Sequence, residues 1–444
     1  MKVGFISLGC SKNLVDTEKA IAIFKERKYE IVNKPEEADI IVVNTCGFIK
    51  EAKEEAINTI LEMAEYKKKN CKYLIAMGCL VERYKNELEK EIPEVDLWIK
   101  YSSYDTLWEQ ISKVVEKDVD FAERYYENCN FLDLKDRVIT TGKAYAYLKI
   151  ADGCSNNCTY CAIPYIRGKQ VSRKIEDIVW EANKLAEAGY KEIILIAQDT
   201  TKYGMDIYGV SKLAELLKAL GEIEKIKWIR FLYAYPETIN DKLIQEVKKN
   251  NKVCKYFDIP IQHISDNVLK MMNRQSSGES IRSLIKKLRE EIPGVIIRTT
   301  VMVGFPRESE EDFNELYNFL KEAKFDKLGC FAYSKEDGTP AANIKEQVHP
   351  RTKKSRYNKV MLLQADISKE NLQEKLGKEI NVLIESRLYN KKYYIGRSYM
   401  DVPEIDGVVY VKSNKALKEG NFVKCKITGV KEYDLIAEAE NFVK

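Results

Sequence analysis

The sequence predicts an α/β protein with three structured parts, and its strand and helix patterns support this prediction in three places. Residues 1–117 and 143–372 both alternate strand-like and helix-like segments, which is typical of parallel sheets covered by helices. Residues 373–444 contain five short strand-like runs broken by Gly, Asn and Pro. We therefore expect an N-terminal parallel α/β domain, a linker over 118–142, a partial (β/α)6 barrel and a small C-terminal antiparallel β-barrel.

The N-terminal part has three strand-like runs that lead into glycine-containing loops. The expected strands are 2–7, 40–44 and 73–77, and the expected helices are 13–28 and 48–68. Ligands of parallel α/β sheets collect at the carboxyl ends of the strands. Residues directly after these strands are therefore the first candidates for a site.

The central part contains six strand–helix units, fewer than the eight of a closed barrel. Its expected strands are 145–151, 192–197, 228–233, 256–259, 295–303 and 327–333. Its expected helices are 174–188, 210–220, 241–250, 279–290, 309–323 and 351–373. The last part is expected to hold strands 380–385, 393–397, 407–411, 422–427 and 434–440.

The charge, apolar runs and cysteine content of the chain limit the classes of protein to which it can belong. The 444 residues carry a net charge of +4, so charge alone indicates no polyanionic partner. No apolar run approaches the roughly 20 residues of a membrane span, and the N-terminus does not read as a secretory signal. Eleven cysteines in a long chain without such a signal indicate reduced thiols, so we expect a cytoplasmic protein without a membrane partner.

Three cysteines lie within eight residues of a loop that follows the strand 145–151. Cys154, Cys158 and Cys161, called the loop cysteine site below, offer the soft thiolates that bind iron–sulfur clusters. Three cysteines leave one iron of a [4Fe-4S] cluster without a protein ligand, and an open position is typical of a catalytic metal. Zinc is the alternative, but the loop has no nearby His and no fourth Cys at zinc-finger spacing.

This C-x3-C-x2-C loop, with Tyr160 before its last cysteine, resembles the signature of the radical S-adenosylmethionine (SAM) enzymes. The resemblance implies that SAM binds the open iron and is cleaved to a 5′-deoxyadenosyl radical. It also implies SAM contacts at Tyr160, at Gln198 and Asp199 after the second barrel strand, and at Gly304 and Pro306 after the fifth. An ordinary turn is the alternative for Gly304 and Pro306.

Three further cysteines each follow a strand of the N-terminal part, and each stands beside a glycine. Cys10 follows the first expected strand, Cys46 the second and Cys79 the third. Because parallel strands end at one edge of a sheet, these residues, called the three-strand cysteine site below, are predicted to form a second three-thiolate site. The remaining cysteines show no ligand spacing and are expected to be packing residues: Cys71, Cys129, Cys254, Cys330 and Cys425.

The motifs around both cysteine sites resemble the methylthiotransferases, which are radical SAM enzymes with an auxiliary cluster in an N-terminal domain. The resemblance rests on Leu8-Gly9-Cys10-Ser11-Lys12-Asn13-Leu14-Val15-Asp16-Thr17-Glu18, on Asn44-Thr45-Cys46-Gly47, on Gly78-Cys79 and on the loop cysteine site. It implies two [4Fe-4S] clusters and sulfide as the sulfur source. One SAM would methylate a sulfur at the auxiliary cluster, and a radical from a second SAM would remove hydrogen from the substrate carbon.

The motif around Cys10 resembles the branch that modifies the β-carbon of an aspartate in ribosomal protein uS12. Ser11 departs from the Pro that is commoner there. The alternative is the MiaB branch, which modifies N6-isopentenyladenosine of tRNA, and only then would nucleic acid be the partner. A non-catalytic electron carrier is a third hypothesis, which the open iron argues against. The resemblance further implies an electron donor such as flavodoxin or ferredoxin.

Other polar residues near the expected sites have open roles. Arg167 and Arg173 are candidates to bind a substrate carboxylate, with a backbone or SAM-carboxylate contact as the alternative. His263 fits a hydrogen-bonded structural residue better than a base, and His349 fits the start of a helix. The turn-rich loop 335–340 is a candidate lid.

The C-terminal part resembles a TRAM module, which usually binds RNA. From Leu376 on it has 12 basic and 10 acidic residues, and 399–406 is openly acidic. RNA-binding surfaces are basic. We therefore expect this part to bind a basic protein and to recruit uS12.

Overall fold

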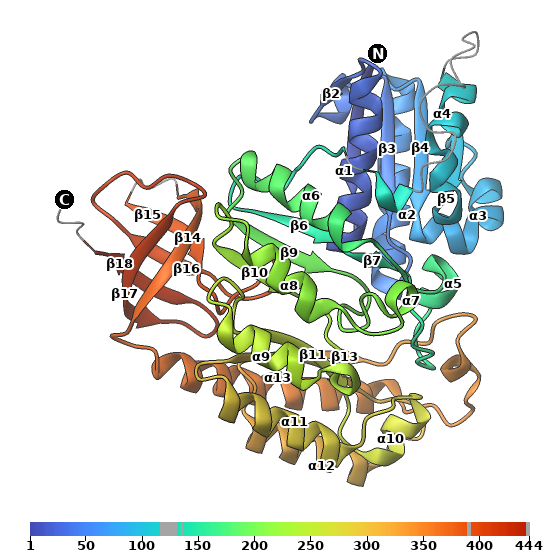
Figure 1. Cartoon of the computed structure of the whole chain (residues 1–444). Coiled ribbons are helices and arrows are strands. Elements are labelled where there is room, and N and C mark those ends of the chain that lie inside the picture. The colour runs from blue at the N-terminus through green and yellow to red at the C-terminus, as the bar shows by residue number, and fades with distance from the viewer. Residues whose placement is uncertain (116–130, 135, 389–391, 441–444) are drawn as a thin grey trace. The chain divides into compact units, whose positions relative to one another are not determined.

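A computed structural model describes residues 1–115, 131–134, 136–388 and 392–440 (Figure 1). The chain forms two compact units. The cysteine unit comprises Met1–Thr140, Ala151–Arg173 and Glu336–Thr339, and the barrel unit comprises Thr141–Ile150, Lys174–Lys335 and Pro340–Lys444. Residues 118–130 and 135 of the expected linker, and with them Cys129, lie outside the described residues.

The cysteine unit is built on a five-stranded parallel sheet in the order β2-β1-β3-β4-β5. Its strands are β1 (Lys2–Ser7), β2 (Glu30–Val32), β3 (Ile40–Thr45), β4 (Tyr73–Gly78) and β5 (Leu97–Lys100). Its main helices are α1 (Ser11–Glu26), α2 (Lys50–Ala64), α3 (Cys79–Glu91) and α4 (Leu107–Val115). The predicted parallel α/β domain is therefore confirmed. The sequence pattern does not reveal β2 and β5, which have only three and four residues.

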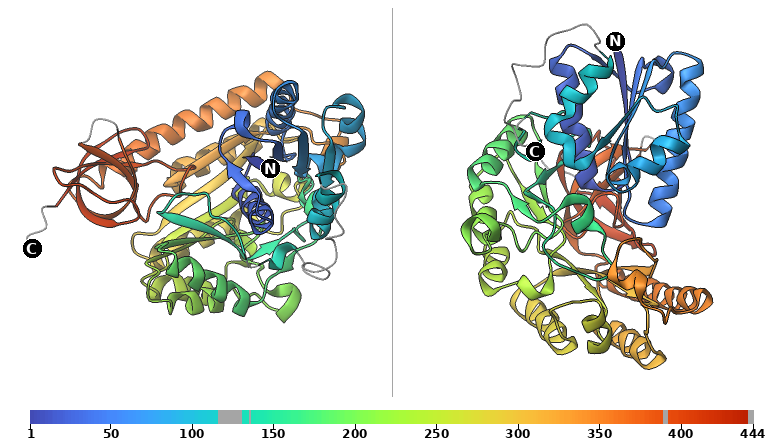
Figure 2. Two further views of the ribbon diagram at one scale, coloured as in Figure 1. Left: turned by 90° about the horizontal axis from the view of Figure 1, so that it is seen from above. Right: turned by 90° about the vertical axis from the view of Figure 1, so that its right-hand side faces the viewer.

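Helices cover both faces of this sheet (Figure 2). On one face α1 and α4 share a core in which Phe24 and Trp108 meet edge to face, with ring centroids 5.5 Å apart. On the other face α2 and α3 bury Ile60 and Leu80. β3 is buried along its whole length, which explains the uninterrupted apolar run at its start.

The barrel unit carries six parallel strands in two sheets, β6-β9-β10 and β11-β12-β13. The strands are β6 (Tyr145–Lys149), β9 (Glu192–Ile196), β10 (Trp228–Phe231), β11 (Tyr256–Gln262), β12 (Ile296–Val303) and β13 (Lys327–Ala332). Its main helices are α6 (Ile175–Glu187), α8 (Leu213–Gly221), α9 (Asp241–Lys249), α11 (Gly278–Glu291), α12 (Glu310–Ala323) and α13 (Pro350–Gln373). Each predicted strand and helix of this part is present.

The chain ends in a closed barrel in the order β14-β15-β16-β18-β17. Its strands are β14 (Glu379–Arg387), β15 (Tyr393–Arg397), β16 (Val409–Lys412), β17 (Phe422–Val430) and β18 (Leu435–Ala439). The predicted barrel is confirmed, but β16 and β18 pair in parallel. Five strands cannot alternate in direction all the way round a closed barrel, so one pair must be parallel. No described helix is long and apolar enough to cross a membrane.

Candidate metal centres

The three-strand cysteine site gathers at the carboxyl edge of the sheet in the cysteine unit. Cys10 stands at the N-cap position of α1, three residues after the end of β1, Cys46 follows β3, and Cys79 begins α3 after β4. These three strands are neighbours in the sheet. The topology therefore brings together three cysteines that are far apart in the sequence.

Two glycines allow the cysteine-bearing loops to approach one another. A Cβ on Gly9, whose φ is +86°, would lie 2.6 Å from the Cβ of Cys46 and 2.9 Å from its Sγ. A Cβ on Gly47 would lie 2.7 Å from the Cα of Leu80 and 2.8 Å from the carbonyl oxygen of Cys79. A larger residue at either position would push the loops apart.

The three thiols influence one another electrostatically. Burial raises the pKa of Cys46, and the neighbouring Cys10 raises it further. Burial also raises the pKa of Cys79 to about 12, with Arg167 acting against it and with smaller upward contributions from Cys10 and Cys46. Cys46 and Cys79 are therefore protonated at neutral pH unless a cation binds. A metal centre supplies the positive charge that stabilises thiolates in such a place.

The donors of this site are the thiols of three cysteines, the ligand type that iron–sulfur clusters use. Within the described residues, no three His, Cys, Asp or Glu side chains converge closely enough to hold one metal ion. In an iron–sulfur cluster the thiolates bind different irons, so they surround the group instead of meeting at a point. Three thiolates from three strand ends suit a [4Fe-4S] cluster with one iron left open.

The loop cysteine site lies between two short strands of the cysteine unit, β7 (Ala151–Asp152) and β8 (Val171–Ser172), which pair antiparallel. The backbone N–H of Cys154 donates to the carbonyl of Gly168 over 3.0 Å, and that of Cys161 donates to the carbonyl of Cys158 over 3.1 Å. Burial raises the pKa of Cys161 to about 12, and the thiols of Cys158 and Cys154 add to the increase. The three cysteines thus occupy one compact loop, and the Cys161 thiol needs a nearby cation to become a thiolate at neutral pH.

Arg167, the last residue of helix α5 (Ile163–Arg167), contacts both cysteine-bearing regions. Its Nη1 donates to the two carboxylate oxygens of Asp152 over 3.0 and 2.8 Å. Its Nη2 donates to Asn13 Oδ1, Asp16 Oδ2 and Cys79 Sγ, over 2.5, 3.0 and 3.5 Å. The expectation that Arg167 binds a substrate carboxylate is therefore wrong, because two carboxylates of the chain already occupy its guanidinium. Arg173 is also buried.

In the barrel unit, Gln198 and Asp199 follow β9, as the sequence indicates. Asp199 is fully buried. Its Oδ1 accepts hydrogen bonds from the N–H and the hydroxyl of Thr201, over 3.0 and 2.6 Å, and from the N–H of Lys202 over 3.3 Å. Asp199 therefore fixes the loop that presents the partly buried Gln198.

Gly304 and Pro306 stand in a rigid loop at the end of β12. The N–H groups of Gly304 and Phe305 both donate to the buried carboxylate of Glu308. Gly304 has a φ of +71°, and a Cβ there would lie 2.4 Å from Cγ of Lys353. The ordinary turn that the sequence leaves open as an alternative is thus a turn that a buried carboxylate holds in place.

The two histidines have structural partners. His263 is fully buried, accepts a hydrogen bond at Nδ1 from the N–H of Ser265 over 3.0 Å, and has its Nε2 3.7 Å from Glu308. This supports the structural interpretation of His263. His349 caps α13 by accepting a hydrogen bond from the N–H of Arg351, so its predicted place at a helix start is confirmed.

The loop that the sequence suggests as a lid is anchored. Its residues Glu336–Thr339 belong to the cysteine unit. Glu336 accepts hydrogen bonds from Lys53 over 2.9 Å and from Arg83 over 3.0 Å, and Arg83 also donates to the carbonyl of Gly47 over 2.8 Å. The segment is therefore tied to the loop that carries Cys46.

The acidic segment 399–406 is not an open acidic surface. Asp401 pairs with Lys327 over 2.9 Å, and Asp406 accepts a hydrogen bond from the hydroxyl of Tyr256 over 2.7 Å. Asp401 and Asp406 are thus engaged within the barrel unit, Glu404 of the same segment is exposed, and recruitment of a basic protein by this part stays a prediction. β11 begins with Tyr256 and β13 begins with Lys327. The hydroxyl of Tyr256 and the ammonium of Lys327 are buried polar groups that need partners, and Asp406 and Asp401 provide them.

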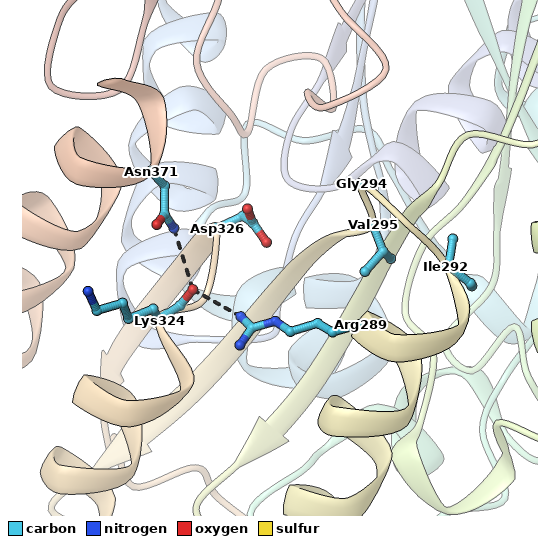
Figure 3. A pocket seen from close by; sticks show the side chains of 7 residues that line it. All are labelled: Arg289, Ile292, Gly294, Val295, Lys324, Asp326 and Asn371. Carbon is cyan, nitrogen blue, oxygen red and sulfur yellow. Dashed lines mark hydrogen bonds between the residues drawn. The ribbon is translucent and has the colours of Figure 1, made fainter. Parts of the chain in front are cut away.

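The cysteines predicted to be packing residues are buried wherever they are described: Cys71, Cys254, Cys330 and Cys425. A cavity of about 290 Å³ lies at the opposite end of the barrel strands from the predicted SAM contacts (Figure 3). It is lined by Arg289, Ile292, Gly294, Val295, Lys324, Asp326 and Asn371. Because these residues precede β12 and β13 or end helices, the cavity is separate from Gln198 and Asp199, which follow β9, and from Gly304 and Pro306, which follow β12.

Sequence reasoning did not identify the polar partners of the cysteine sites. Asn13 and Asp16 are three residues apart on α1, directly after Cys10, and both are buried. Buried polar residues at helical spacing beside a candidate ligand are a signal that could have found them. Asp152 and Glu336 give no such signal, because only the tertiary fold brings them to their partners.

Comparison with known proteins identifies the parts of the chain. Residues 2–100 match a family described as uncharacterized protein family UPF0004, residues 148–320 match the radical SAM superfamily, and residues 376–439 match the TRAM domain. The radical SAM methyltransferase TsrM from Kitasatospora setae, solved with cobalamin and a [4Fe-4S] cluster, has the same fold with a TM-score of 0.55. It is 12% identical, and the match covers 77% of each chain. The family matches, together with the fold, thus define a radical SAM enzyme with a TRAM domain.

Relatives at higher identity define the family. Proteins named ribosomal protein uS12 methylthiotransferase RimO are 60% identical in Alkaliphilus oremlandii, 52% in Caldicellulosiruptor saccharolyticus and 49% in Acetivibrio thermocellus. These matches cover 99% of this chain and 98–99% of each relative. The chain belongs to the RimO family of radical SAM methylthiotransferases.

Proposed function

We propose that this enzyme adds a methylthio group to the β-carbon of an aspartate of ribosomal protein uS12. The relatives described above are named for methylthiotransfer to uS12, and the match extends over nearly their full length. The observation that carries the proposal is that two three-cysteine sites lie in one compact unit, joined by Arg167. Methylthiotransfer needs a radical generator and a sulfur carrier, so each site has a distinct task.

In this proposal the loop cysteine site, Cys154, Cys158 and Cys161, binds the [4Fe-4S] cluster that holds SAM. The three-strand cysteine site, Cys10, Cys46 and Cys79, binds a second [4Fe-4S] cluster that takes sulfide as the sulfur source. When bound, these groups and two SAM molecules supply hydrogen abstraction and a methylated sulfur. The chain itself supplies three thiolates to each group and excludes water from Cys79 and Cys154, which are both buried.

The proposed SAM contacts are Tyr160 beside the loop cysteines, Gln198 and Asp199 after β9, and Gly304 and Pro306 after β12. Asp199 orients the Gln198 loop through its hydrogen bonds to Thr201. Glu308 holds the backbone of Gly304 and Phe305, so this stretch can receive a flat adenine without rearranging. Preorganisation of this kind is what a cofactor pocket needs.

We propose that the TRAM domain recruits uS12 and that an electron donor such as flavodoxin or ferredoxin reduces the cluster at the loop cysteine site. The alternative substrate is tRNA, as in the MiaB branch. Burial of Asp401 and Asp406 removes one argument against that alternative, so the substrate has to be tested directly.

The test uses protein that is purified and reconstituted without oxygen, and that should contain about eight irons if both sites hold [4Fe-4S] clusters. It receives SAM, sulfide and reductant, with a uS12 peptide in one reaction and unmodified tRNA in another. Mass spectrometry should show a methylthio group on the peptide aspartate alone. Addition to tRNA alone would contradict the proposed substrate, and no deoxyadenosine in either reaction would contradict the radical chemistry.

A further inference from the structure

Arg167 contacts a residue close to the loop cysteine site and a residue of the three-strand cysteine site. It follows Cys161 by six residues, and its ion-pair partner Asp152 precedes Cys154 by two. Its Nη2 donates to the sulfur of Cys79. The side chain of Arg167 therefore contacts Asp152, in the strand that leads into the loop cysteine site, and a sulfur of the three-strand cysteine site.

The surroundings of Arg167 fix its position. Its side chain is 1% exposed, and the carboxylates of Asp16 and Asp152 are 0% and 5% exposed. The ring of Tyr101 lies against the guanidinium, with 4.4 Å between its centroid and Cζ. Any other rotamer would leave buried charges without partners, which is strongly unfavourable.

The same network reaches the other cysteine-bearing loops through Asn13. Asn13 Oδ1 accepts from Arg167 and lies 3.5 Å from the Cys79 sulfur. Its Nδ2 donates to the carbonyls of Leu8 and Thr45, over 3.1 and 2.9 Å. Leu8 is two residues before Cys10, and Thr45 directly precedes Cys46. Arg167 and Asn13 together therefore contact all three loops of this site.

We propose that Arg167 is a positioning residue that locks the loop cysteine site onto the three-strand cysteine site and tunes the auxiliary cluster through the sulfur of Cys79. This inference rests on the proposed function, because it assumes a cluster at Cys10, Cys46 and Cys79. Methylthiotransfer requires the radical and the sulfur to meet at one substrate carbon, so the two sites must keep a fixed separation. The buried guanidinium of Arg167, which binds Asp152 beside one site and Cys79 of the other, meets that requirement.

The second part of the proposal follows from charge. A hydrogen bond and a cation at a ligand sulfur stabilise the reduced state of an iron–sulfur cluster, which makes its reduction potential more positive. Lysine would keep the positive charge. Its single ammonium group could not donate both to Asp152 and to the set of Asn13, Asp16 and Cys79, as the two Nη atoms of arginine do. Arg167→Met and Arg167→Lys therefore separate the effect of charge from that of position.

The first experiment measures the potential of the auxiliary cluster alone, in full-length protein with Cys154, Cys158 and Cys161 replaced by Ala. Potentiometric titration followed by electron paramagnetic resonance should give a more negative potential for Arg167→Met and a smaller shift for Arg167→Lys. Arg230→Lys is the control, because Arg230 is as deeply buried and pairs with Glu192 over 3.0 Å in the barrel unit. It should leave the potential unchanged.

The second experiment needs no metal. Hydrogen exchange of the metal-free protein should be faster over residues 151–173 in Arg167→Met than in the natural chain or in Arg230→Lys. In the loaded enzyme, Arg167→Met should lower methylthio product by about 10- to 100-fold while SAM cleavage without substrate persists. If Arg167→Met does not fold, the same measurements on Arg167→Lys test the proposal.

The outcomes separate this inference from the proposed function. If the natural chain binds about four irons instead of about eight, the auxiliary cluster is wrong and this inference falls with it. If it binds about eight and both Arg167 variants match the natural chain in potential, exchange and product, the inference is wrong and the proposed function stands. If the potential changes equally in Arg230→Lys, the effect is not specific to Arg167.

Discussion

Cysteines at the two ends of β4 differ in what surrounds them. Cys79, after the strand, lies beside Asn13 and Arg167. Cys71, before the strand, packs in the apolar core between the sheet, α2 and α3, and its thiol donates to the carbonyl of Tyr73 over 3.3 Å. Both are buried, so burial alone does not mark a ligand.

Replacement of these two cysteines should therefore have different results. If Cys79 binds the proposed auxiliary cluster, Cys79→Ala should lower the iron content from about eight to about four per chain and abolish methylthio product. SAM cleavage should continue. Cys71→Ala is the matched control and should keep both clusters. Iron analysis and product assays distinguish the two, and equal iron loss in both variants would contradict the assignment.

At the scale of elements, the approach of the loop after β1 to the loop after β3 depends on Gly9. Gly9→Ala would place a methyl group 2.6 Å from the Cβ of Cys46, in addition to the cost of about 1 kcal/mol for a positive φ. We expect loss of cluster binding at this edge. Gly189→Ala is the control, because Gly189 has a φ of +101° with no atom within 4 Å of the added Cβ.

Iron content of the two glycine variants checks this prediction. Gly189→Ala should introduce only the strain of a positive φ and should keep about eight irons per chain. The iron content of Gly9→Ala should fall toward four. Full iron binding by Gly9→Ala would show that the loops can move apart without loss of the site.

The segment Glu336–Thr339 is a second element whose role can be measured. Glu336→Gln should loosen it, because Arg83 loses a buried carboxylate partner, and such a loss costs about 3–5 kcal/mol. Hydrogen exchange should become faster over 336–339 and over the Cys46 loop. Glu346→Gln, which breaks an exposed pair with Arg307, should have no measurable effect. Similar exchange in both variants would mean that burial of the Glu336 pair is unimportant.

Elements differ in how well the sequence reveals them. Long periodic segments such as α6 and α12 are visible because an apolar stripe repeats over many residues. β2 and β5 are too short for any period. The cysteine sites are visible because their residue type and spacing are rare, whereas the link from Arg167 to Asp16 joins residues 151 positions apart. A pattern along the chain cannot show a partner that only tertiary structure supplies.

The acidic segment 399–406 shows the same limit for charge. Its sequence is that of a solvated acidic loop, yet Asp401 and Asp406 meet partners at the starts of β13 and β11. Those partners, Lys327 and Tyr256, stand at positions where a strand pattern predicts apolar side chains. Charge counted along a chain therefore overstates the charge that a surface presents.

At the scale of the whole barrel unit, Glu192 joins the six-stranded part to the C-terminal barrel. Its carboxylate accepts from Arg230 over 3.0 Å and from Arg397 over 2.7 Å, and all three side chains are buried. β10 carries Arg230, and β15 carries Arg397. A single carboxylate thus pairs with two buried guanidinium groups from two different sheets, and Arg397 also donates to Glu385 over 2.6 Å.

Glu192→Gln should destabilise the barrel unit by about 3–5 kcal/mol, because it leaves two buried guanidinium groups with one fewer charge partner. Burial acts to raise the pKa of Glu192, but Arg397 and Arg230 outweigh it, so its pKa lies below the ordinary 4.5. The stabilisation is therefore present above pH 4.5 and is lost as the pH falls through the folded-state value. Denaturant unfolding should show a difference in the free energy of unfolding between the natural chain and the variant that is constant near neutral pH and shrinks in acid.

The control is Glu438→Gln, which breaks an exposed pair with Lys412 and should give no such difference. A gap between Glu192→Gln and the natural chain that did not change with pH would mean that packing, and not the charge of Glu192, holds the two sheets together.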